Sequence, residues 1–316
     1  MENGMLDNEL IILAGPTGVG KTALSLELAK AIGGEIISAD SIQVYKGLDI
    51  GSAKISFEHR RGIKHHLLDI WEPTEPFDVV RFQKMTALCI RQVRERKAVP
   101  ILVGGTGFYI QSILKDVSFT PVDIPTKLMT ELEALSSEEL YEKLKEIDPN
   151  YADIVHVNNR KRVLRAVSYT LTAGEPFSVY NDRERQRTSP YHYTYFVLTN
   201  DRAVLYEQID RRVDHMLAAG LINEVIRLKE QGCHAAMTSM QGIGYKEVLA
   251  YLDGEIDYPS MVEQIKQHTR HYAKRQLTWF KREPDVIWLS RQELPHDEQL
   301  LHTMISEIEK RRRNNG

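Results

Sequence analysis

The chain carries one short stretch with a highly specific pattern, Gly15-Pro16-Thr17-Gly18-Val19-Gly20-Lys21-Thr22. It matches G-x-x-x-x-G-K-[ST] at every fixed position, which is the pattern of a phosphate-binding P-loop. The glycines let backbone N–H groups converge on phosphate oxygens without interference from Cβ atoms. Lys21 supplies a mobile positive charge, and the hydroxyl of Thr22 is placed to bind Mg²⁺. We therefore predict that all eight residues surround a phosphate group.

The sequence on both sides of this motif has the context that a P-loop requires. Residues 9–14 are an apolar run that predicts a strand, and Leu24, Leu28 and Ile32 follow at helical spacing. The pair Gly33-Gly34 predicts the end of that helix. A strand, a glycine turn and a helix in this order disfavour the alternative of a chance glycine turn.

Further apolar runs alternate with helical patterns along the chain. These runs predict strands at residues 35–39, 98–103, 191–198 and 286–289. The second run leads into another glycine turn, Gly104-Gly105-Thr106-Gly107. Unbroken apolar strands that alternate with helices indicate a parallel sheet covered on both faces. We predict an α/β fold, with a P-loop NTPase-like parallel sheet core flanked by helices.

The pattern changes after Lys115, where Pro121 and Pro125 punctuate a polar stretch. Residues 126–172 then have a helical pattern with no clear strand, until Gly174 breaks it. This predicts an all-helical insertion domain within one core. The boundaries that we predict are a core of residues 1–115 and 191–316 and an insertion of residues 116–190.

Length and composition limit the function classes. The chain has 316 residues, 42% of them hydrophobic, which is enough for about two domains, and its formal net charge is −3. Cys89 and Cys233 are far apart and form no C-x-x-C pair, so we expect neither a disulfide framework nor a cysteine zinc site. The polar start Met1-Glu2-Asn3-Gly4 and the lack of a long apolar run predict a soluble, cytoplasmic protein without a membrane span, and a monomer is the default expectation. We expect the tail, residues 310–316, to be frayed and solvated.

The motif alone does not say which phosphate is bound. Most P-loops hold a nucleoside triphosphate, and such enzymes usually carry an acid after an apolar strand to help hold Mg²⁺. Here Gly104 follows the strand at residues 98–103, whereas Asp40 follows the strand at residues 35–39 and lies near the loop if the strands are neighbours. No N-K-x-D guanine signature is present. The sequence therefore predicts phosphate and magnesium binding without a clear hydrolytic apparatus.

Two stretches contain several basic residues and no acidic residue. The first, residues 154–173, contains four basic side chains, and the second, residues 264–282, contains six, interleaved with aromatics. In the second, Lys266, Arg270 and Lys274 are four apart and share one face of a helix. Basic stripes with aromatic neighbours suit an RNA backbone and stacked bases, and a solvated helix face is the alternative.

The motifs together resemble those of one family, the bacterial tRNA dimethylallyltransferases, also called tRNA isopentenyltransferases. The resemblance runs from Leu10 to about Leu289. Besides the P-loop, the matching segments are Asp40-Ser41-Ile42-Gln43-Val44-Tyr45, His65-His66-Leu67-Leu68-Asp69, Gly104-Gly105-Thr106-Gly107-Phe108-Tyr109, Asn159-Arg160-Lys161-Arg162-Val163-Leu164-Arg165-Ala166, Gln241-Gly242-Ile243-Gly244-Tyr245-Lys246-Glu247 and Thr269-Arg270-His271-Tyr272-Ala273-Lys274-Arg275-Gln276-Leu277-Thr278-Trp279-Phe280.

The resemblance implies a reaction. Enzymes of the family transfer a dimethylallyl group from dimethylallyl diphosphate to N6 of the adenosine just 3′ of the tRNA anticodon. The P-loop would then hold the diphosphate of the donor, Asp40 would match the general base, and Thr106 would lie near the target base. Arg212 matches an arginine that steadies the diphosphate, although Arg211 stands beside it.

The resemblance also implies the contacts with the tRNA anticodon stem-loop. The residues that match these contacts are Asp40, Ser41, Ile42, Gln43, Lys161, Arg162, Val163, Leu164, Arg165, Gln241, Gly242, Ile243, Gly244, Tyr245, Lys246, Lys274, Arg275, Gln276, Trp279 and Lys281. Eukaryotic relatives of the family carry a C-terminal zinc finger, and we expect none here because no cysteine follows Cys233.

Several alternatives stay open at this level. Asp40 could instead cap the end of its strand or lie in the second shell of a magnesium ion. His65 and His66 with Asp69 suggest a metal site, but structural hydrogen bonds are favoured because adjacent residues of a strand point in opposite directions. The competing functions are a P-loop kinase of a small molecule and a prenyl transferase that acts on free adenine nucleotides.

Overall fold

The computed structural model describes residues 8–119 and 123–315, so Met1–Gly4, Pro121 and Gly316 lie outside it. The elements in chain order are β1 (Glu9–Ala14), α1 (Lys21–Ile32), β2 (Gly34–Ala39), the 3₁₀ helix η1 (Phe57–Arg60), β3 (His65–His66), α2 (Val79–Glu95), β4 (Val99–Gly104), α3 (Gly107–Leu114), α4 (Thr126–Ala134), α5 (Ser137–Ile147), α6 (Pro149–Ala152), α7 (Arg160–Ala173), α8 (Phe177–Gln186), β5 (His192–Thr199), α9 (Arg202–Ala218), α10 (Leu221–Glu230), the 3₁₀ helix η2 (Thr238–Gln241), α11 (Tyr245–Leu252), α12 (Tyr258–Phe280), β6 (Val286–Ser290) and α13 (Asp297–Asn315).

The strands form one parallel sheet in the order β3-β2-β4-β1-β5-β6, which confirms the predicted fold class. The strand before the P-loop and the strand before Asp40 are not neighbours, because β4 lies between them. Gly104 of β4 is level with Ala14 of β1 on one side and with Ala39 of β2 on the other. The P-loop, Asp40 and the turn after β4 therefore all leave the sheet at its carboxyl edge, where parallel α/β sheets bind their ligands.

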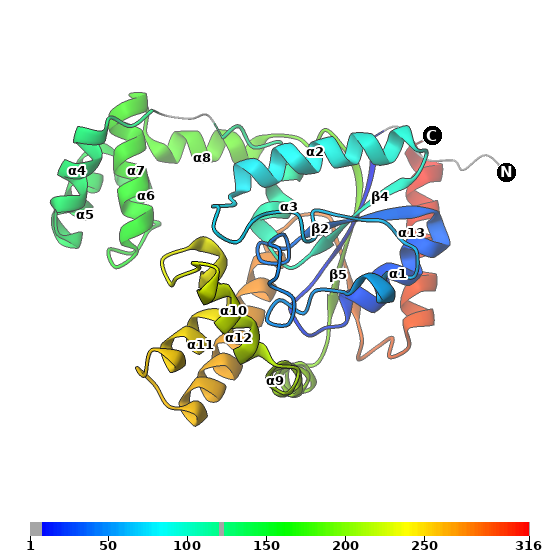
Figure 1. Cartoon of the computed structure of the whole chain (residues 1–316). Coiled ribbons are helices and arrows are strands. Elements are labelled where there is room, and N and C mark those ends of the chain that lie inside the picture. The colour runs from blue at the N-terminus through cyan, green and yellow to red at the C-terminus, as the bar shows by residue number, and fades with distance from the viewer. Residues whose placement is uncertain (1–7, 120–122, 316) are drawn as a thin grey trace. The chain divides into compact units, whose positions relative to one another are not determined.

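Helices cover both faces of the sheet (Figure 1). Alternate strand residues such as Ile11 and Leu13 join a buried cluster that includes side chains of α1 and α13. The intervening residues point to the opposite face, where α2 packs on β2 and β4. The central strand β1 is buried along its whole length, which explains why it reads as an unbroken apolar run.

Glycines shape the turn between β1 and α1. Gly18 and Gly20 have φ values of 83° and 92°, in a region that residues with a Cβ rarely adopt. Gly20 is the N-cap of α1, and Gly33 ends that helix in the left-handed conformation with its N–H bonded to the carbonyl of Ala29. Both helix ends are where the sequence pattern predicts them.

The chain divides into two compact units, one of Met1–Ile113 with Pro190–Gly316 and one of Leu114–Ser189. The described part of the second unit contains α4 to α8 and no strand. Its own apolar cluster includes Leu140, Leu144, Val163 and Phe177. Buried Asp148 accepts hydrogen bonds from the hydroxyl and the N–H of Ser178, which ties α6 to α8.

The C-terminal segment differs from the expected frayed tail. Helix α13 continues to Asn315. Arg312 forms two hydrogen bonds of 2.8 Å with the buried carboxylate of Glu9 in β1, and Arg311 donates to the carbonyl of Tyr193 in β5. The expectation was wrong because these partners lie on strands that are distant in the sequence. No helix within the described ranges is both long and apolar enough to cross a membrane.

Candidate active site

Lys21 is held inside the P-loop. Its Nζ donates hydrogen bonds to the carbonyl oxygens of Gly15 and Pro16, at 2.9 and 2.8 Å. Burial, with a smaller contribution from the charge of Arg212, lowers the pKa of Lys21 to about 7, while the carboxylate of Asp40 acts in the opposite direction. The lysine is therefore close to its titration point at neutral pH, and an anion bound beside it would favour its charged form.

Asp40 lies directly after β2 at the carboxyl edge of the sheet. Its Oδ1 accepts hydrogen bonds from the N–H groups of Ile42 and Gln43, at 2.9 and 3.2 Å. This is the capping arrangement considered for the strand end, and it engages only one of the two oxygens. The charge of Asp40 opposes the lowering of the pKa values of both Lys21 and Arg212, so one carboxylate and two cations lie within electrostatic range of each other.

The structure distinguishes Arg212 from Arg211. Arg212, on α9, is half-buried and donates from Nη2 to the carbonyl oxygen of Ser52 at 3.4 Å. Burial lowers the pKa of Arg212, and the nearby Asp40 opposes this shift. The neighbouring Arg211 points elsewhere, since its side chain is 67% exposed and pairs with Glu207. Only Arg212 therefore belongs to the cluster around the P-loop.

Thr106 lies at the start of α3, where its carbonyl accepts the N–H groups of Tyr109 and Ile110. Its hydroxyl is buried without a hydrogen bond of ordinary geometry to any described residue. The phenol of Tyr272 is its neighbour. Burial, with a smaller contribution from the charge of Asp40, raises the pKa of Tyr272 to about 12, and the Thr106 hydroxyl acts in the opposite direction. Tyr272 thus joins Thr106 and Asp40, a role that its place in a basic helix did not reveal.

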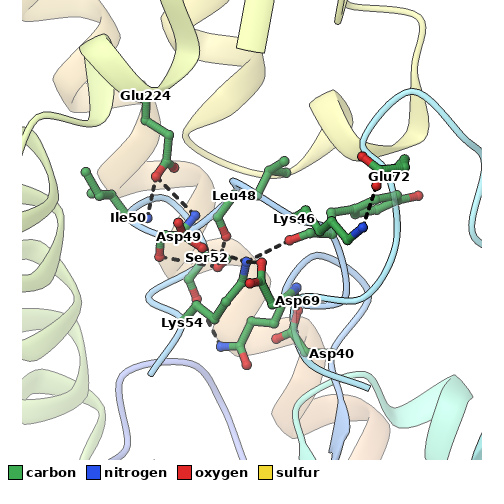
Figure 2. Close-up of polar contacts among 12 residues, drawn as sticks. Asp40, Lys46, Leu48, Asp49, Ile50, Ser52, Lys54, Asp69, Glu72 and Glu224 are labelled. Atoms are coloured by element: carbon green, nitrogen blue, oxygen red, sulfur yellow. Dashed lines mark hydrogen bonds and ion pairs between the residues drawn. The ribbon is translucent and has the colours of Figure 1, made fainter. Parts of the chain in front are cut away.

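The loop after β2 is fixed by a buried carboxylate (Figure 2). Glu224 of α10 is 1% exposed and accepts the N–H groups of Asp49, Ile50 and Gly51 as well as the hydroxyl of Tyr245. These contacts position the next residue, Ser52.

The carbonyl oxygen of Ser52 joins the two sides of the site. It accepts Nη2 of Arg212 and also Nε2 of Gln43, the latter at 3.1 Å. Lys54 strengthens the same loop, with Nζ 2.6 Å from Asp49 and 2.8 Å from Asp69 (Figure 2). The Gln43 side chain is thereby held on the same carbonyl as the Arg212 guanidinium.

The histidine pair has a structural role. His66 lies 2.7 Å from the carboxylate of Glu35, which also accepts two hydrogen bonds from Arg96, and His65 bonds to the carbonyl of Ile63. The bonds from Arg96 lower the pKa of Glu35 to about 2. Within the described ranges, no group of three His, Cys, Asp or Glu side chains could hold a metal.

Arg291 contacts the P-loop and was not predicted from the sequence. Arg291 follows β6 and donates from Nε to the carbonyl of Val19 at 2.8 Å, while its Nη2 pairs with Asp297. It therefore holds the tip of the P-loop from the far end of the chain. Its position directly after a parallel strand was the available signal.

The exposed face of α12 forms a basic groove of about 440 Å³. Its lining residues are His271, Lys274, Arg275, Thr278, Trp279 and Arg282. Lys274 and Arg275 are exposed, and no ion pair with either is found in the described part of the chain. The groove thus contains Lys274, Arg275 and Trp279, three of the residues predicted to contact tRNA.

The basic stripe predicted on α12 is only partly correct. Lys266 pairs with Asp214 at 2.6 Å, and Arg270 binds Asp210 at 2.7 Å. Both acids come from α9, so an acid-free stretch of sequence did not mean an unpaired face. Of the three stacked basic residues, only Lys274 is left for an external partner within the described structure.

The remaining predicted tRNA contacts differ in their accessibility. Val163, Tyr245 and Gln276 are 0%, 0% and 6% exposed, so their side chains contact protein, and a tRNA contact at these three positions stays a prediction. Gly242 and Gly244 are buried. The exposed residues are Lys161, Arg162, Arg165, Gln241 and Lys281, and those of intermediate exposure are Ser41, Ile42, Gln43, Leu164, Ile243, Lys246 and Trp279.

The chain is similar to known proteins over nearly its whole length. Residues 43–283 match the family model described as IPP transferase. A tRNA dimethylallyltransferase of Lachnoclostridium phytofermentans is 53% identical over 94% of this chain and 96% of its own length. The structure of the full-length tRNA isopentenylpyrophosphate transferase of Bacillus halodurans is 37% identical, with a TM-score of 0.73 over 96% of this chain and 98% of that one. A eukaryotic dimethylallyltransferase acting on tRNA is 30% identical, with a TM-score of 0.79 over 90% of this chain and 74% of that one.

Proposed function

The chain belongs to the IPP transferase family of tRNA dimethylallyltransferases, and we propose that it transfers a dimethylallyl group from dimethylallyl diphosphate to N6 of the adenosine 3′ of the anticodon. The observation that carries this proposal is the cluster of Lys21, Asp40 and Arg212 at the end of the sheet. Two cations and a P-loop suit a diphosphate, and the carboxylate beside them suits a proton acceptor.

The chemistry balances with these residues. The C1–O bond of the donor breaks, and its electron pair leaves with the diphosphate, while C1 bonds to N6 of the adenine. The amine loses a proton, which Asp40 would accept. A positioned base of this kind contributes about 10²- to 10⁴-fold to a rate.

The leaving diphosphate is stabilised by the loop. The N–H groups at the start of α1, Lys21 and Arg212 would all face the developing negative charge. Such preorganised donors usually supply the largest part of the rate enhancement. The target adenine must also leave its stack to reach a buried site, next to Thr106 and Tyr272.

The site offers a magnesium ion few protein ligands. Mg²⁺ usually keeps several waters and takes one or two protein oxygens together with phosphate oxygens. Thr22, in the first turn of α1, offers one hydroxyl there, and the described residues hold no carboxylate cluster for a metal. Thr22 would therefore hold the ion together with the diphosphate of the donor. When bound, it would neutralise charge on the leaving group.

The acceptor surface follows from the basic segments. The α12 groove and the exposed residues of α7 in the unit Leu114–Ser189 would contact the phosphates of the anticodon stem-loop. This unit corresponds to the helical insertion, for which we propose a tRNA-binding role. The enzyme would work as a monomer, and its tRNA substrate points to the cytoplasm.

The choice between acceptors can be tested directly. Labelled dimethylallyl diphosphate is offered with unmodified tRNA, with the same tRNA carrying guanosine 3′ of the anticodon, and with adenosine monophosphate. We expect label on the first RNA alone. Label on the free nucleotide would favour an adenylate prenyl transferase, and ATP-dependent phosphorylation of a small acceptor would favour a kinase.

A further inference from the structure

The side chain of Gln276 joins two loops that are distant in the sequence. Its Oε1 accepts the backbone N–H of Thr17 at 2.9 Å, and its Nε2 donates to the carbonyl oxygen of Gly105 at 2.9 Å. Thr17 belongs to the P-loop, and Gly105 directly precedes Thr106. An N–H group can only donate and a carbonyl can only accept, so a single orientation of the amide satisfies both partners.

This bridge is buried and closely packed. Gln276 is 6% exposed, so its amide depends on protein partners. A Cβ at position 105 would lie 2.2 Å from Nε2 of Gln276, so any larger residue there would force the amide of Gln276 out of this position. The turn and the side chain are therefore matched to each other in shape as well as in hydrogen bonding.

Helix α12 has different roles on its two faces. Tyr272, Gln276 and Phe280 are four apart and share the inner face. Lys274 and Arg275 line the basic groove on the outer face. The helix that carries this groove therefore also holds the P-loop against the turn that contains Thr106.

We propose that Gln276 is a positioning residue that fixes the distance between the P-loop and the Gly105 turn. Resting on the proposed prenyl transfer, this would align the donor held by the P-loop with the acceptor amine near Thr106. In this role Gln276 acts through Thr17 and Gly105, and its amide also lies beside the phenol of Tyr272. Displacing reacting groups by about 1 Å can cost on the order of 10²-fold in rate.

Two substitutions separate the two bonds. Gln276→Met keeps the length of the side chain and loses both bonds, whereas Gln276→Glu keeps an acceptor for Thr17 and loses the donor for Gly105. We expect Gln276→Met to lower kcat about 10- to 100-fold, while KM for tRNA and for the donor stays within about threefold. Gln276→Glu should also lose kcat, because a carboxylate facing the carbonyl of Gly105 pushes the turn away.

A matched control measures the effect of lost packing. Ile265 is a buried apolar residue of α12 that takes no part in this bridge. Ile265→Ala should lower the melting temperature but keep kcat at temperatures where it is folded. A kcat for Gln276→Met within twofold of the unmodified enzyme, or an equal loss in Ile265→Ala, would overturn the proposal.

Hydrogen exchange gives a readout that needs no catalysis. The peptide that contains Thr17 should exchange faster in Gln276→Met and at the original rate in Ile265→Ala. Unchanged exchange in Gln276→Met would contradict the bridge. If the unmodified enzyme transferred no prenyl group to tRNA, the proposed function would fail, and the exchange rates would still decide whether Gln276 holds the loop.

Discussion

Arg212 donates a hydrogen bond from Nη2 to the backbone carbonyl oxygen of Ser52, at 3.4 Å. This contact holds its guanidinium on the loop after β2, within electrostatic range of Lys21, whereas the preceding residue Arg211 pairs with Glu207 on the surface. The two arginines are a matched pair with the same chemistry, the same helix and opposite surroundings.

Replacing each arginine by alanine should therefore have different effects. Arg212→Ala should lower kcat about 10²- to 10³-fold, because the leaving diphosphate loses a charged donor. Arg211→Ala should stay within twofold, since exposed ion pairs contribute little. Steady-state kinetics with saturating tRNA measure both variants. Equal losses would show that Arg212 has no special role in the reaction.

Two variants of Asp40 separate its roles as a base and as a cap. Asp40→Asn keeps an oxygen for the N–H groups of Ile42 and Gln43 but cannot accept a proton as a base. We expect both Asp40→Asn and Asp40→Ala to lose about 10²- to 10⁴-fold in kcat, with tRNA binding nearly unchanged. Single-turnover rates and filter binding provide the two measurements. Full activity in Asp40→Asn would show that Asp40 is not the base and that it only caps the end of its strand.

The lowered pKa of Lys21 predicts a proton linkage. Burial brings this pKa to about 7, so at pH 8 the free enzyme holds Lys21 mostly neutral. Bound diphosphate favours the charged form and raises the pKa, so binding should take up close to one proton at pH 8 and much less at pH 6. Calorimetry in buffers of different ionisation enthalpy measures this uptake. Lys21→Met should abolish it; uptake that is the same at both pH values would contradict this assignment.

The buried Glu224 should be important for stability. Each carboxylate oxygen of Glu224 accepts two hydrogen bonds. Glu224→Gln replaces one of these oxygens by an NH₂ group, which cannot accept a hydrogen bond from either donor. We expect a loss of about 2–3 kcal/mol in the free energy of unfolding, because charged hydrogen bonds are lost and donors are left unpaired. Glu207→Gln, at an exposed ion pair, should cost less than about 1 kcal/mol. Urea unfolding compares the two, and similar losses would argue against the role of Glu224 as an anchor.

The basic groove predicts how salt affects tRNA binding. Lys274→Ala should reduce the slope of log K against log salt by about 0.7–0.9, which corresponds to one phosphate contact. Lys266→Ala removes the same charge from the same helix, but its partner Asp214 already neutralises it, so the slope should not change. Binding titrations at several salt concentrations test this contrast. An equal change in both variants would mean that the groove is not the contact surface.

Local patterns in the sequence were sufficient for the fold. The P-loop, the buried strand β1 and the glycine that ends α1 each depend on neighbouring residues, and the structure confirms all three. The choice between Arg211 and Arg212 was open because adjacent residues of a helix differ by about 100° in direction, and the sequence does not fix the phase of α9.

Contacts between distant segments were beyond such patterns. Asp210 and Asp214 are four apart on α9 and meet Lys266 and Arg270, which are four apart on α12. Each stretch looks like a free charged face until the two helices pack. The bridge made by Gln276 could not be predicted for the same reason, since a glutamine in a basic helix does not indicate two buried hydrogen-bond partners in distant loops.

The central claim is that the P-loop holds a phosphate group that leaves and is not transferred. A donor labelled with ¹⁴C in the dimethylallyl group and ³²P in the diphosphate tests this in one reaction with unmodified tRNA. We predict that all transferred ¹⁴C is found on the adenosine 3′ of the anticodon and that all ³²P is released as diphosphate. ³²P on the RNA, or diphosphate released without ¹⁴C on the RNA, would contradict the account.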